Sequence, residues 1–422
     1  MSCYNDIPAD IISTILYHLR HDHSTLRACS LISPIFLFPS RMYLYSEINL
    51  SVGSRQCRKF RDLLSSNPHL GVHVRHLSIK DSQEDHDSDV GWILSEPALP
   101  FVIESLPLLR SFYLSCFKPD DNKLILEWHT LPSGLKSSIF HLLQLATLEK
   151  VEFRSLRFPI SIFCDSPQLR CMHLPGCFLD GAAKTIKQLY RHDKTRLTQL
   201  SITAETYSSD LIDTLTHVFD VSQLRDLIIL GPNPRMLKVA KELINSSALS
   251  MERFQWSLPY FYNSTGYITS HIPMDLSIVS NLRVLEMGVD FWYENPKRDP
   301  FPWLFRTLSD IAKSGNTVNL ERIVVGVTAE GFGDHELRSL IGYSIWGDLD
   351  AILTGGAYSK LQSVTIYLCA LYTPGELSSV WLAPMKKRLP SLRAKGLLHI
   401  TRYPFHQDMR GRGFFATEIQ LR

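Results

Sequence analysis

Apolar residues recur every four positions near the start of the chain, which predicts an amphipathic helix. The stripe consists of Ile7, Ile11, Ile15 and Leu19, and it is widened by Ile12 and Leu16. Pro8 suits the first turn of such a helix, because a backbone N–H at that position has no intrahelical acceptor. The pattern therefore predicts a helix whose one face is strongly apolar.

Two further short helices are predicted before residue 50. Polar residues 21–24 supply capping groups, and residues 25–33 then carry Leu26 and Leu31 on a second helix. Pro34 ends or kinks that helix, and Pro39 with Ser40 opens a third one. Ile48 and Leu50 alternate like a strand. So small a unit hides too little of its apolar area to be stable alone, so we expect a partner to cover part of it. That partner is either another protein or the domain that follows.

The stretch IPADIISTILYHL, residues 7–19, resembles the LPxEILxxIFxxL opening of the F-box family. Residues 25–33 and 39–48 resemble the second half of the same motif, and Phe36 stands near a position where many members carry Trp. The resemblance implies that residues 7–50 bind the Skp-type adaptor of a cullin-containing ubiquitin ligase. Carried over by position, the adaptor-binding residues would be Ile7, Pro8, Ile11, Ile12, Ile15, Leu16, Leu19, Leu26, Leu31 and Phe36.

One six-residue pattern recurs beyond residue 70: an apolar residue, two mostly polar residues, an apolar residue, any residue and a last apolar residue. The starts at 169, 197, 224 and 251 are 28, 27 and 27 residues apart. The instances are VRHLSI (74–79), LRSFYL (109–114), LEKVEF (148–153), LRCMHL (169–174), LTQLSI (197–202), LRDLII (224–229), MERFQW (251–256), LRVLEM (282–287), LERIVV (320–325), LQSVTI (361–366) and a degenerate LRAKGL (392–397).

The last two apolar positions of each hexamer lie two apart, which predicts strands. The segments 182–192, 209–219 and 234–244 between hexamers have helical periodicity. The pattern resembles the L-x-x-L-x-L core of the leucine-rich repeat family over roughly residues 70–400. The resemblance implies an irregular α/β solenoid, with a parallel sheet on one face and helices on the other. An ordinary α/β domain with a parallel sheet is the alternative. We therefore expect an F-box-like module at 1–50 and a repeat region at 51–422.

Residues at alternate strand positions would point away from the core of such a sheet and line its open face in rows. This face is a candidate surface for binding a protein target, or else a merely solvated sheet. Its predicted residues are Cys171, His173, Gln199, Ser201, Asp226, Ile228, Arg253, Gln255, Val284 and Glu286.

Composition narrows the class of protein. Lys and Arg number 44 against 42 Asp and Glu, a balance that does not favour nucleic acid as the partner. Apolar runs are too short to span a membrane, and the first residues lack signal-peptide features, which predicts a cytoplasmic or nuclear protein. The eight cysteines contain no C-x-x-C pair, which favours reduced thiols over disulfides or zinc.

Other segments give weaker indications. The aromatic residues of 290–303 are either a binding loop or buried packing, and the acidic residues 83–89 are best explained as a solvated loop. The basic C-terminal tail is best explained as a solvated tail, and the alternative is contact with an acidic partner or RNA. Motifs for nucleophilic, phosphate-binding or metalloprotease sites do not occur, so we expect no enzyme, cofactor or metal.

The sequence thus predicts a substrate-receptor subunit of a Skp-cullin-F-box type ubiquitin ligase, with an unidentified protein target. A repeat scaffold unrelated to ubiquitin and an enzyme of unrecognised type are the alternatives.

Overall fold

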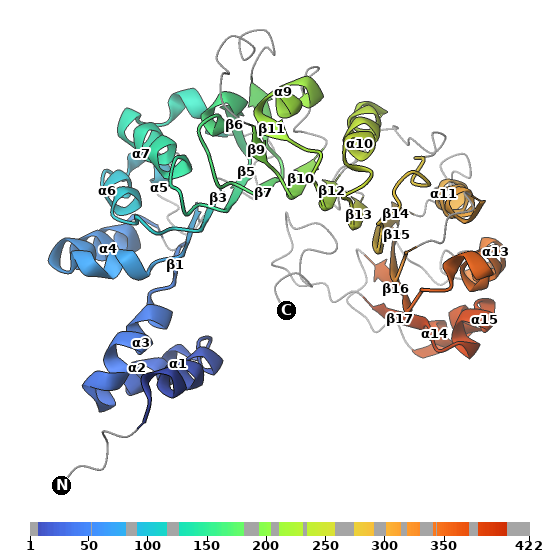
Figure 1. The fold of residues 1–422 in the computed structure, drawn as a ribbon, viewed down its shortest axis with the longest axis horizontal. Coiled ribbons are helices and arrows are strands. Elements are labelled where there is room, and N and C mark those ends of the chain that lie inside the picture. Colours follow the sequence, from blue (N-terminus) through green and yellow to red (C-terminus); the bar gives the residue numbers. More distant parts are fainter. Residues whose placement is uncertain are drawn as a thin grey trace. The chain divides into compact units, whose positions relative to one another are not determined.

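The protein is described by a computed structural model that covers residues 7–51, 53–81, 91–115, 126–180, 194–203, 211–230, 234–257, 274–290, 301–313, 319–329, 341–342, 344–370 and 379–402 (Figure 1). The chain forms two compact units. The first comprises Met1–Met172 and Cys177–Gly181, and the second comprises His173–Gly176 and Ala182–Arg422. The predicted functional division at residue 50 stays a prediction.

The first unit begins with the helices α1 (Ala9–His18) and α2 (His23–Ile32), as the apolar spacing predicts. Asp22 caps α2, because its Oδ1 accepts hydrogen bonds from the backbone N–H groups of Ser24, at 3.1 Å, and Thr25, at 3.0 Å. Hydrogen bonds from Thr25 and Ser24 hold the pKa of the Asp22 carboxyl well below its usual range. The polar break at 21–24 is thus a helix cap, as predicted.

The third helix differs from the prediction. Helix α3 spans Pro34–Leu44, so it begins at Pro34, and Pro39 lies inside it. Ser33 is extended and stands before the helix, which puts Pro34 in the first turn, where its missing N–H breaks no hydrogen bond. The expectation that Pro39 opens the helix was therefore wrong. A proline after an extended serine was the stronger start signal.

The first unit continues with parallel strands in the order β1, β2, β3 and β5, followed by β7, of which Cys171 and Met172 belong to this unit and His173 and Leu174 to the second. Neighbouring strands of β1 to β5 pair in register, with Leu77 opposite Phe112 and Phe112 opposite Val151. The rings of Phe112, Phe153 and Phe158 are fully buried beneath this sheet and meet edge to face. The strands are β1 (Glu47–Leu50), β2 (His76–Lys80), β3 (Ser111–Ser115), β5 (Lys150–Arg154) and β7 (Cys171–Leu174).

Helices connect these strands, as parallel pairing requires. A second small parallel sheet has the order β4 (Leu126–Glu127), β6 (Leu156–Pro159) and β8 (Phe178–Asp180). The connecting α-helices are α4 (Ser54–Ser66), α5 (Trp92–Ser95), α6 (Leu99–Glu104) and α7 (Ser133–Leu143). The 3-10 helices are η2 (Pro68–His73), η3 (Trp128–Thr130) and η4 (Ile160–Phe163).

The second unit contains a parallel sheet whose strands follow the chain order from β10 to β17. Figure 1 shows α10, α11 and α13 on one side of these strands. The side chains of Leu227, Phe254, Leu285, Ile323 and Val364 lie in one register row and are fully buried. The strands are β10 (Gln199–Thr203), β12 (Asp226–Leu230), β13 (Arg253–Ser257), β14 (Val284–Asp290), β15 (Arg322–Ala329), β16 (Ser363–Ala370) and β17 (Leu398–Arg402).

The remaining elements of the second unit lie between these strands. A short parallel pair is formed by β9 (Thr195–Arg196) and β11 (Phe219–Asp220). The helices are α9 (Leu211–Val218), α10 (Pro234–Ser247), α11 (Phe301–Lys313), α13 (Ile345–Thr354), the 3-10 helix η7 (Gly356–Tyr358), α14 (Ser379–Arg388) and α15 (Pro390–Ala394).

Each regular hexamer supplies one strand, as predicted, but LRAKGL does not. Its residues 392–394 belong to α15, and the last strand, β17, begins only at Leu398. Gly396 has a φ of 70°, a left-handed conformation that ends the helix before the strand. Leu392 is fully buried as a helix residue, which explains its apolar character without a strand. Of the three predicted helices, 209–219 and 234–244 are confirmed by α9 and α10, and 182–192 lies outside the described residues.

A backbone ladder joins successive hexamers. The carbonyl of the second residue of one hexamer accepts two N–H groups, those of the second and third residues of the next. Arg75 thus accepts from Arg110 at 2.8 Å and Ser111 at 3.0 Å, and Arg225 accepts from Glu252 and Arg253, both at 2.9 Å. Because these bonds recur at the same position, they fix the register of each strand against its neighbour.

The chain is therefore an α/β protein with a large parallel sheet and helices packed against it. Among its described helices, none combines the length and the apolar character needed to cross a bilayer.

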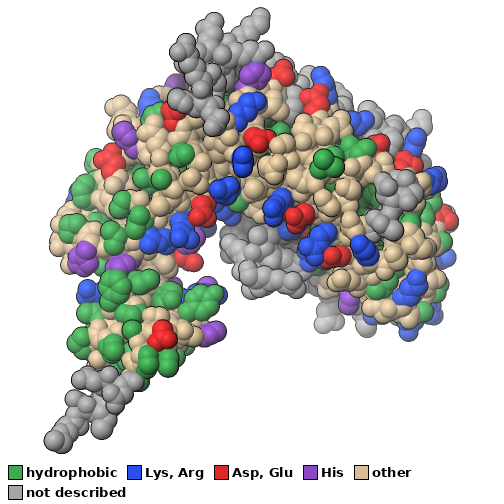
Figure 2. Space-filling model, viewed as in Figure 1, with side chains coloured by type: hydrophobic (Ala, Val, Ile, Leu, Met, Phe, Trp, Pro, Cys, Tyr) green, Lys and Arg blue, Asp and Glu red, His purple; other side chains and the backbone are tan. Residues whose placement is uncertain are grey.

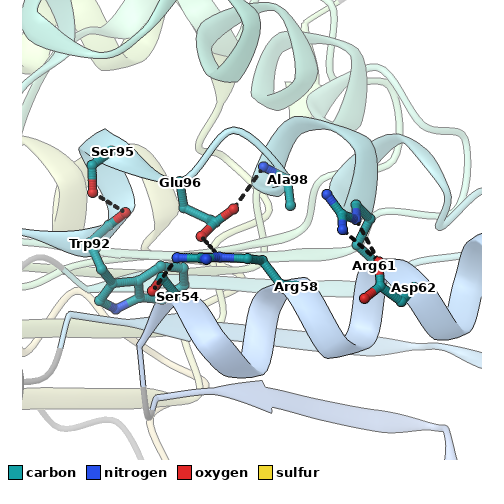
Figure 3. Close-up of polar contacts among 8 residues, drawn as sticks. All are labelled: Ser54, Arg58, Arg61, Asp62, Trp92, Ser95, Glu96 and Ala98. Carbon is teal, nitrogen blue, oxygen red and sulfur yellow. Dashed lines mark hydrogen bonds and ion pairs between the residues drawn. The ribbon is translucent and has the colours of Figure 1, made fainter.

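A buried carboxylate fastens α4 to α6 in the first unit (Figure 3). The Glu96 side chain is only 1% exposed and accepts a hydrogen bond from Arg58 Nε at 2.9 Å. Its second oxygen accepts from the backbone N–H of Ala98 at 3.0 Å, at the start of α6. The neighbouring Cys57 thiol has its pKa raised to about 12 by burial and by the charge of Glu96.

We expect Glu96→Ala to lower the free energy of unfolding by about 2 kcal/mol, because it removes the acceptor of a buried N–H and of an arginine. Urea unfolding followed by far-UV circular dichroism measures this. The matched control is Asp62→Ala, which removes the exposed ion pair between Asp62 and Arg61 and should leave the unfolding midpoint almost unchanged. Equal midpoints for the two variants would contradict the anchoring role of Glu96.

Candidate functional site

The first candidate site is the outer face of helix α1. Ile7, Ile11 and Ile15 are 42%, 47% and 46% exposed, and Pro8 is also exposed. On the opposite side of the same helix, Ile12 and Leu16 are buried. The apolar stripe is thus split between a core and a surface that the chain leaves open to solvent.

Helices α2 and α3 extend this open apolar surface. Leu31 is 86% exposed, Ile32 69% and Phe38 62%, and Ile35 and Met42 are exposed to a lesser degree. Figure 2 shows apolar side chains gathered over these helices. Clusters of exposed large apolar side chains commonly mark interaction sites. We call the surface of Ile7, Ile11, Ile15, Leu31, Ile32, Ile35, Phe38 and Met42 the apolar face.

The ten predicted adaptor-binding residues therefore fall into two groups. Ile7, Pro8, Ile11, Ile15 and Leu31 are exposed. The other five build the small core of the three helices: Ile12, Leu16 and Leu26 are buried, with Leu19 and Phe36 packed against them. Direct contact with a partner is thus open to the first group, and the second group holds the helices in place.

Sequence reasoning missed Ile32, Ile35, Phe38 and Met42 as surface residues. The sequence did carry a sign of exposure for two of them, because residues 35–38 are a continuous apolar run. One buried helix face cannot cover four consecutive residues, so some of them must face outward.

The Phe38 ring also contacts the buried His73 ring, at 5.2 Å between centroids, so α3 contacts η2. Burial lowers the pKa of the His73 imidazole, and the charges of His69, Arg75 and Arg41 lower it further.

The second candidate site is the alternate face of the sheet in the second unit. The register places Gln199, Asp226, Arg253 and Val284 in one row. Ser201, Ile228, Gln255 and Glu286 form a second row beside it. The predicted rows are thus formed by β10 to β14. Cys171 and His173 lie two apart on β7 and are half-buried.

The two rows differ in exposure. Gln199, Asp226, Arg253 and Val284 are half-buried, whereas the second row is covered, with Gln255 2% and Glu286 1% exposed. The sequence pattern correctly assigns these residues to one face, but it does not indicate that half of them are shielded from solvent. A partner on this face would meet the first row before the second.

Polar contacts cross the strands on this face. Gln199 donates a hydrogen bond to Asp226, and Arg253 Nη2 donates to Glu286 Oε1 at 2.6 Å. Arg322 Nη2 lies 3.9 Å from the same Glu286 oxygen. Burial raises the pKa of the Asp226 carboxyl, and the bond from Gln199 and the charge of Arg253 oppose that rise. Cross-strand contacts therefore hold polar side chains of this face in position, although the buried Arg253 Nε has no hydrogen-bond partner among the described residues.

The remaining sequence candidates contribute little to these sites. Residues 83–89, 291–300 and the basic tail from 403 onward lie outside the described residues. Within the described part of the chain, no three His, Cys, Asp or Glu side chains are grouped as metal ligands. Cys29, Cys57, Cys164, Cys171 and Cys177 are thiols that form no disulfide, and burial raises the pKa of Cys177 to about 12. A thiol with so high a pKa is a poor nucleophile at neutral pH.

We expect Glu286→Gln to lower the free energy of unfolding by about 2 to 3 kcal/mol, because it leaves the Arg253 guanidinium without its buried counter-charge. Urea unfolding of the full chain measures the loss. The control is Glu321→Gln, which removes an exposed carboxylate paired with Arg283 at 2.9 Å and should have a much smaller effect. A loss no greater than that of the control would show that the buried pair does not stabilise the sheet.

Comparison with protein-family models and with curated proteins gives no significant match to this chain. The likeness to the F-box and leucine-rich repeat families therefore rests on the residue spacing alone.

Proposed function

We propose that the protein is a substrate-receptor subunit of a Skp-cullin-F-box type ubiquitin ligase, acting in the cytoplasm or nucleus. Helices α1 to α3 form the F-box-like module that docks the Skp-type adaptor, and the strand–helix repeats form a leucine-rich-repeat-like solenoid that holds a protein target. The chain itself contributes no catalytic residue. It accelerates ubiquitin transfer by bringing the target close to the ligase.

One observation carries the proposal. Of the apolar residues at the start of the chain that the F-box spacing assigns to the adaptor, Ile7, Ile11 and Ile15 are about half exposed. Ile12 and Leu16, which the same spacing also assigns, fill the core of the three helices. A helix that merely capped the next domain would turn this stripe inward. The core of the three helices has only Ile12, Leu16 and Leu26 fully buried, which leaves their apolar area to be covered by another chain.

The area still open is sufficient for a specific interaction. Complete burial of an isoleucine contributes about 1.5 to 3 kcal/mol, so burying the exposed half of one contributes about 1 kcal/mol. Several such residues on the apolar face together would supply a large part of the binding free energy of a micromolar complex, which is about 8 kcal/mol. Leu31 and Ile32, the most exposed of them, add the most new buried area.

The sheet supports the second half of the proposal. Strands β10 to β17 follow one another in chain order, which is how a solenoid arranges its repeats. Such repeats present one residue per strand in each row, and here the half-buried row carries Gln199, Asp226 and Arg253. Polar side chains held in position by their neighbours give specificity for a protein surface of complementary charge.

The docking half is tested with Ile11→Glu combined with Ile15→Glu. Both side chains are exposed, so the helix should still fold, but two carboxylates would have to enter an apolar interface. We expect the affinity for a purified Skp-type adaptor, measured by isothermal titration calorimetry, to fall by more than tenfold.

The matched control is Leu249→Glu, since Leu249 is 81% exposed and lies in the second unit. It should leave adaptor binding unchanged. Wild-type affinity in the α1 double variant, or no adaptor binding by the wild-type chain, would overturn the docking proposal and favour a repeat scaffold unrelated to ubiquitin.

The target-binding half is tested with His173→Glu combined with Gln199→Lys, both on half-buried positions of the predicted face. The new lysine can pair with Asp226, so folding should be maintained while the surface changes. Proteins captured from cells by wild-type and variant chains are compared by mass spectrometry, with adaptor recovery as the internal standard. We expect loss of at least one target at constant adaptor recovery. An unchanged set of captured proteins would show that the sheet face is merely solvated.

A further inference from the structure

A group of cations lies at the start of the strands in the first unit. Arg75, Arg110 and Lys150 occupy the second or third position of three successive hexamers. Arg75 and Arg110 stand directly before the adjacent strands β2 and β3, and Lys150 is the first residue of β5. Arg110 is exposed, and Arg75 and Lys150 are half-buried. His76 is exposed in the same register row as Ser111 and Lys150. We call Arg75, His76, Arg110 and Lys150 the basic rim.

The backbone ladder holds these charges close together. Arg75 O accepts the N–H of Arg110, and Arg110 O accepts the N–H of Lys150 at 2.9 Å. Neighbouring parallel strands lie about 4.8 Å apart, so the charges are within about one Debye length at physiological salt. Their mutual effect is visible in the pKa values: burial lowers the pKa of Arg75 and the charge of Arg110 lowers it further. Desolvation likewise lowers the pKa of His76, which Lys150, Arg110 and Arg75 also lower and Glu47 raises.

In the second unit, charges at the same ladder positions form ion pairs. There the charge alternates from one hexamer to the next, and opposite charges pair. Arg225 lies 3.7 Å from Glu252, and Arg283 meets both oxygens of Glu321 at 2.9 Å. Figure 2 shows blue and red side chains side by side along this edge. The fold thus allows neutralisation at these positions, and the second unit uses it.

Such pairing is missing from the basic rim within the part of the chain that the structure describes. The acidic neighbours are Glu149, beside Arg110 in the ladder, and Glu47, paired in register with His76. Neither carboxylate comes within 4 Å of the Arg75, Arg110 or Lys150 charge among the ion pairs of the described residues. Arg75 Nη1 instead donates to the Leu108 carbonyl at 3.0 Å, which holds its side chain in place but does not neutralise it.

We propose that the basic rim binds an acidic segment of a partner protein. Carboxylates of an extended acidic peptide, which alternate sides at about 3.3 Å per residue, can reach cations on successive strands. The proposal goes beyond adaptor docking and target binding on the sheet face, because the rim lies at the strand ends of the first unit and its residues belong to neither site.

The chemistry favours a peptide over nucleic acid. The rim combines its cations with Glu149 and Glu47, which would repel the continuous charge of a phosphate backbone. A peptide can place a glycine or a hydrogen-bond donor opposite these carboxylates. The net charge of the whole chain is only +2, so no broad positive field draws a polyanion toward this surface.

The test uses a short fluorescein-labelled peptide of alternating glutamate and glycine, with fluorescence anisotropy on the full chain. We expect binding that weakens with added NaCl, and no binding of the same peptide with glutamine in place of glutamate. Arg110→Glu combined with Lys150→Glu should weaken binding about tenfold, because attraction becomes repulsion at two positions. The milder Arg110→Gln with Lys150→Gln should weaken it about threefold, and this variant decides the question if the first one unfolds.

The matched control is Lys59→Glu, an exposed position on helix α4 of the same unit, which should change the affinity less than twofold. Similar losses for this control would mean that net charge alone governs binding and would overturn the proposal. So would failure of the peptide to bind the wild-type chain. A single-stranded oligo-dT that binds more tightly than the peptide, with the same sensitivity to the rim variants, would assign the surface to nucleic acid instead.

Discussion

The parallel backbone ladder between successive hexamers is the constraint on which the rest of the structure depends. A parallel strand cannot return by a tight turn, so each strand must be followed by a crossover before the next can pair. One backbone carbonyl then accepts hydrogen bonds from two N–H groups of the next strand, as the Arg225 carbonyl does from Glu252 and Arg253. These backbone bonds set the register of the two strands, and side chains are not needed for it. Once the register is fixed, every alternate residue is committed either to the buried row of Phe254 and Leu285 or to the opposite face.

The sequence predicted those features that depend on local spacing. The ten regular hexamers predict strands because alternation of apolar residues is a property of the strand itself, and the four-residue stripe predicts α1 for the same reason. The spacing gave wrong predictions at two places. Helix α3 starts at Pro34, after the extended Ser33, and not at Pro39. Leu392 is apolar because it is a buried helix residue, and it does not belong to a strand. The candidate site was half predictable. Its rows follow from register, but the burial of Gln255 and Glu286 depends on what surrounds the face, which no periodicity encodes.

The charged positions of the ladder show a further limit of sequence reading. Arg110 and Arg225 have the same place in equivalent hexamers, LRSFYL and LRDLII, and appear interchangeable in the sequence. Each faces a glutamate across the ladder, but Arg225 lies 3.7 Å from Glu252, whereas Arg110 and Glu149 form no ion pair among the described residues. Those glutamates lie in the next hexamers, 27 and 39 residues further along the chain, as the starts at 224 and 251, and at 109 and 148, show. Only the pairing of strands reveals which charges meet.

The apolar face and the basic rim express the same physical situation in two forms. Burying an isoleucine and neutralising an arginine both lower the free energy, and the chain does each elsewhere, with Ile12 in the helical core and Arg283 beside Glu321. At the apolar face and the rim the described residues supply no such complement, although other parts of the chain supply it. Apolar area left exposed and cations left without a counter-charge are therefore best explained by a second molecule that covers or neutralises them. The apolar face is suited to an apolar partner and the rim to an acidic one, so the two surfaces fit two different proteins, as the proposed substrate receptor would require.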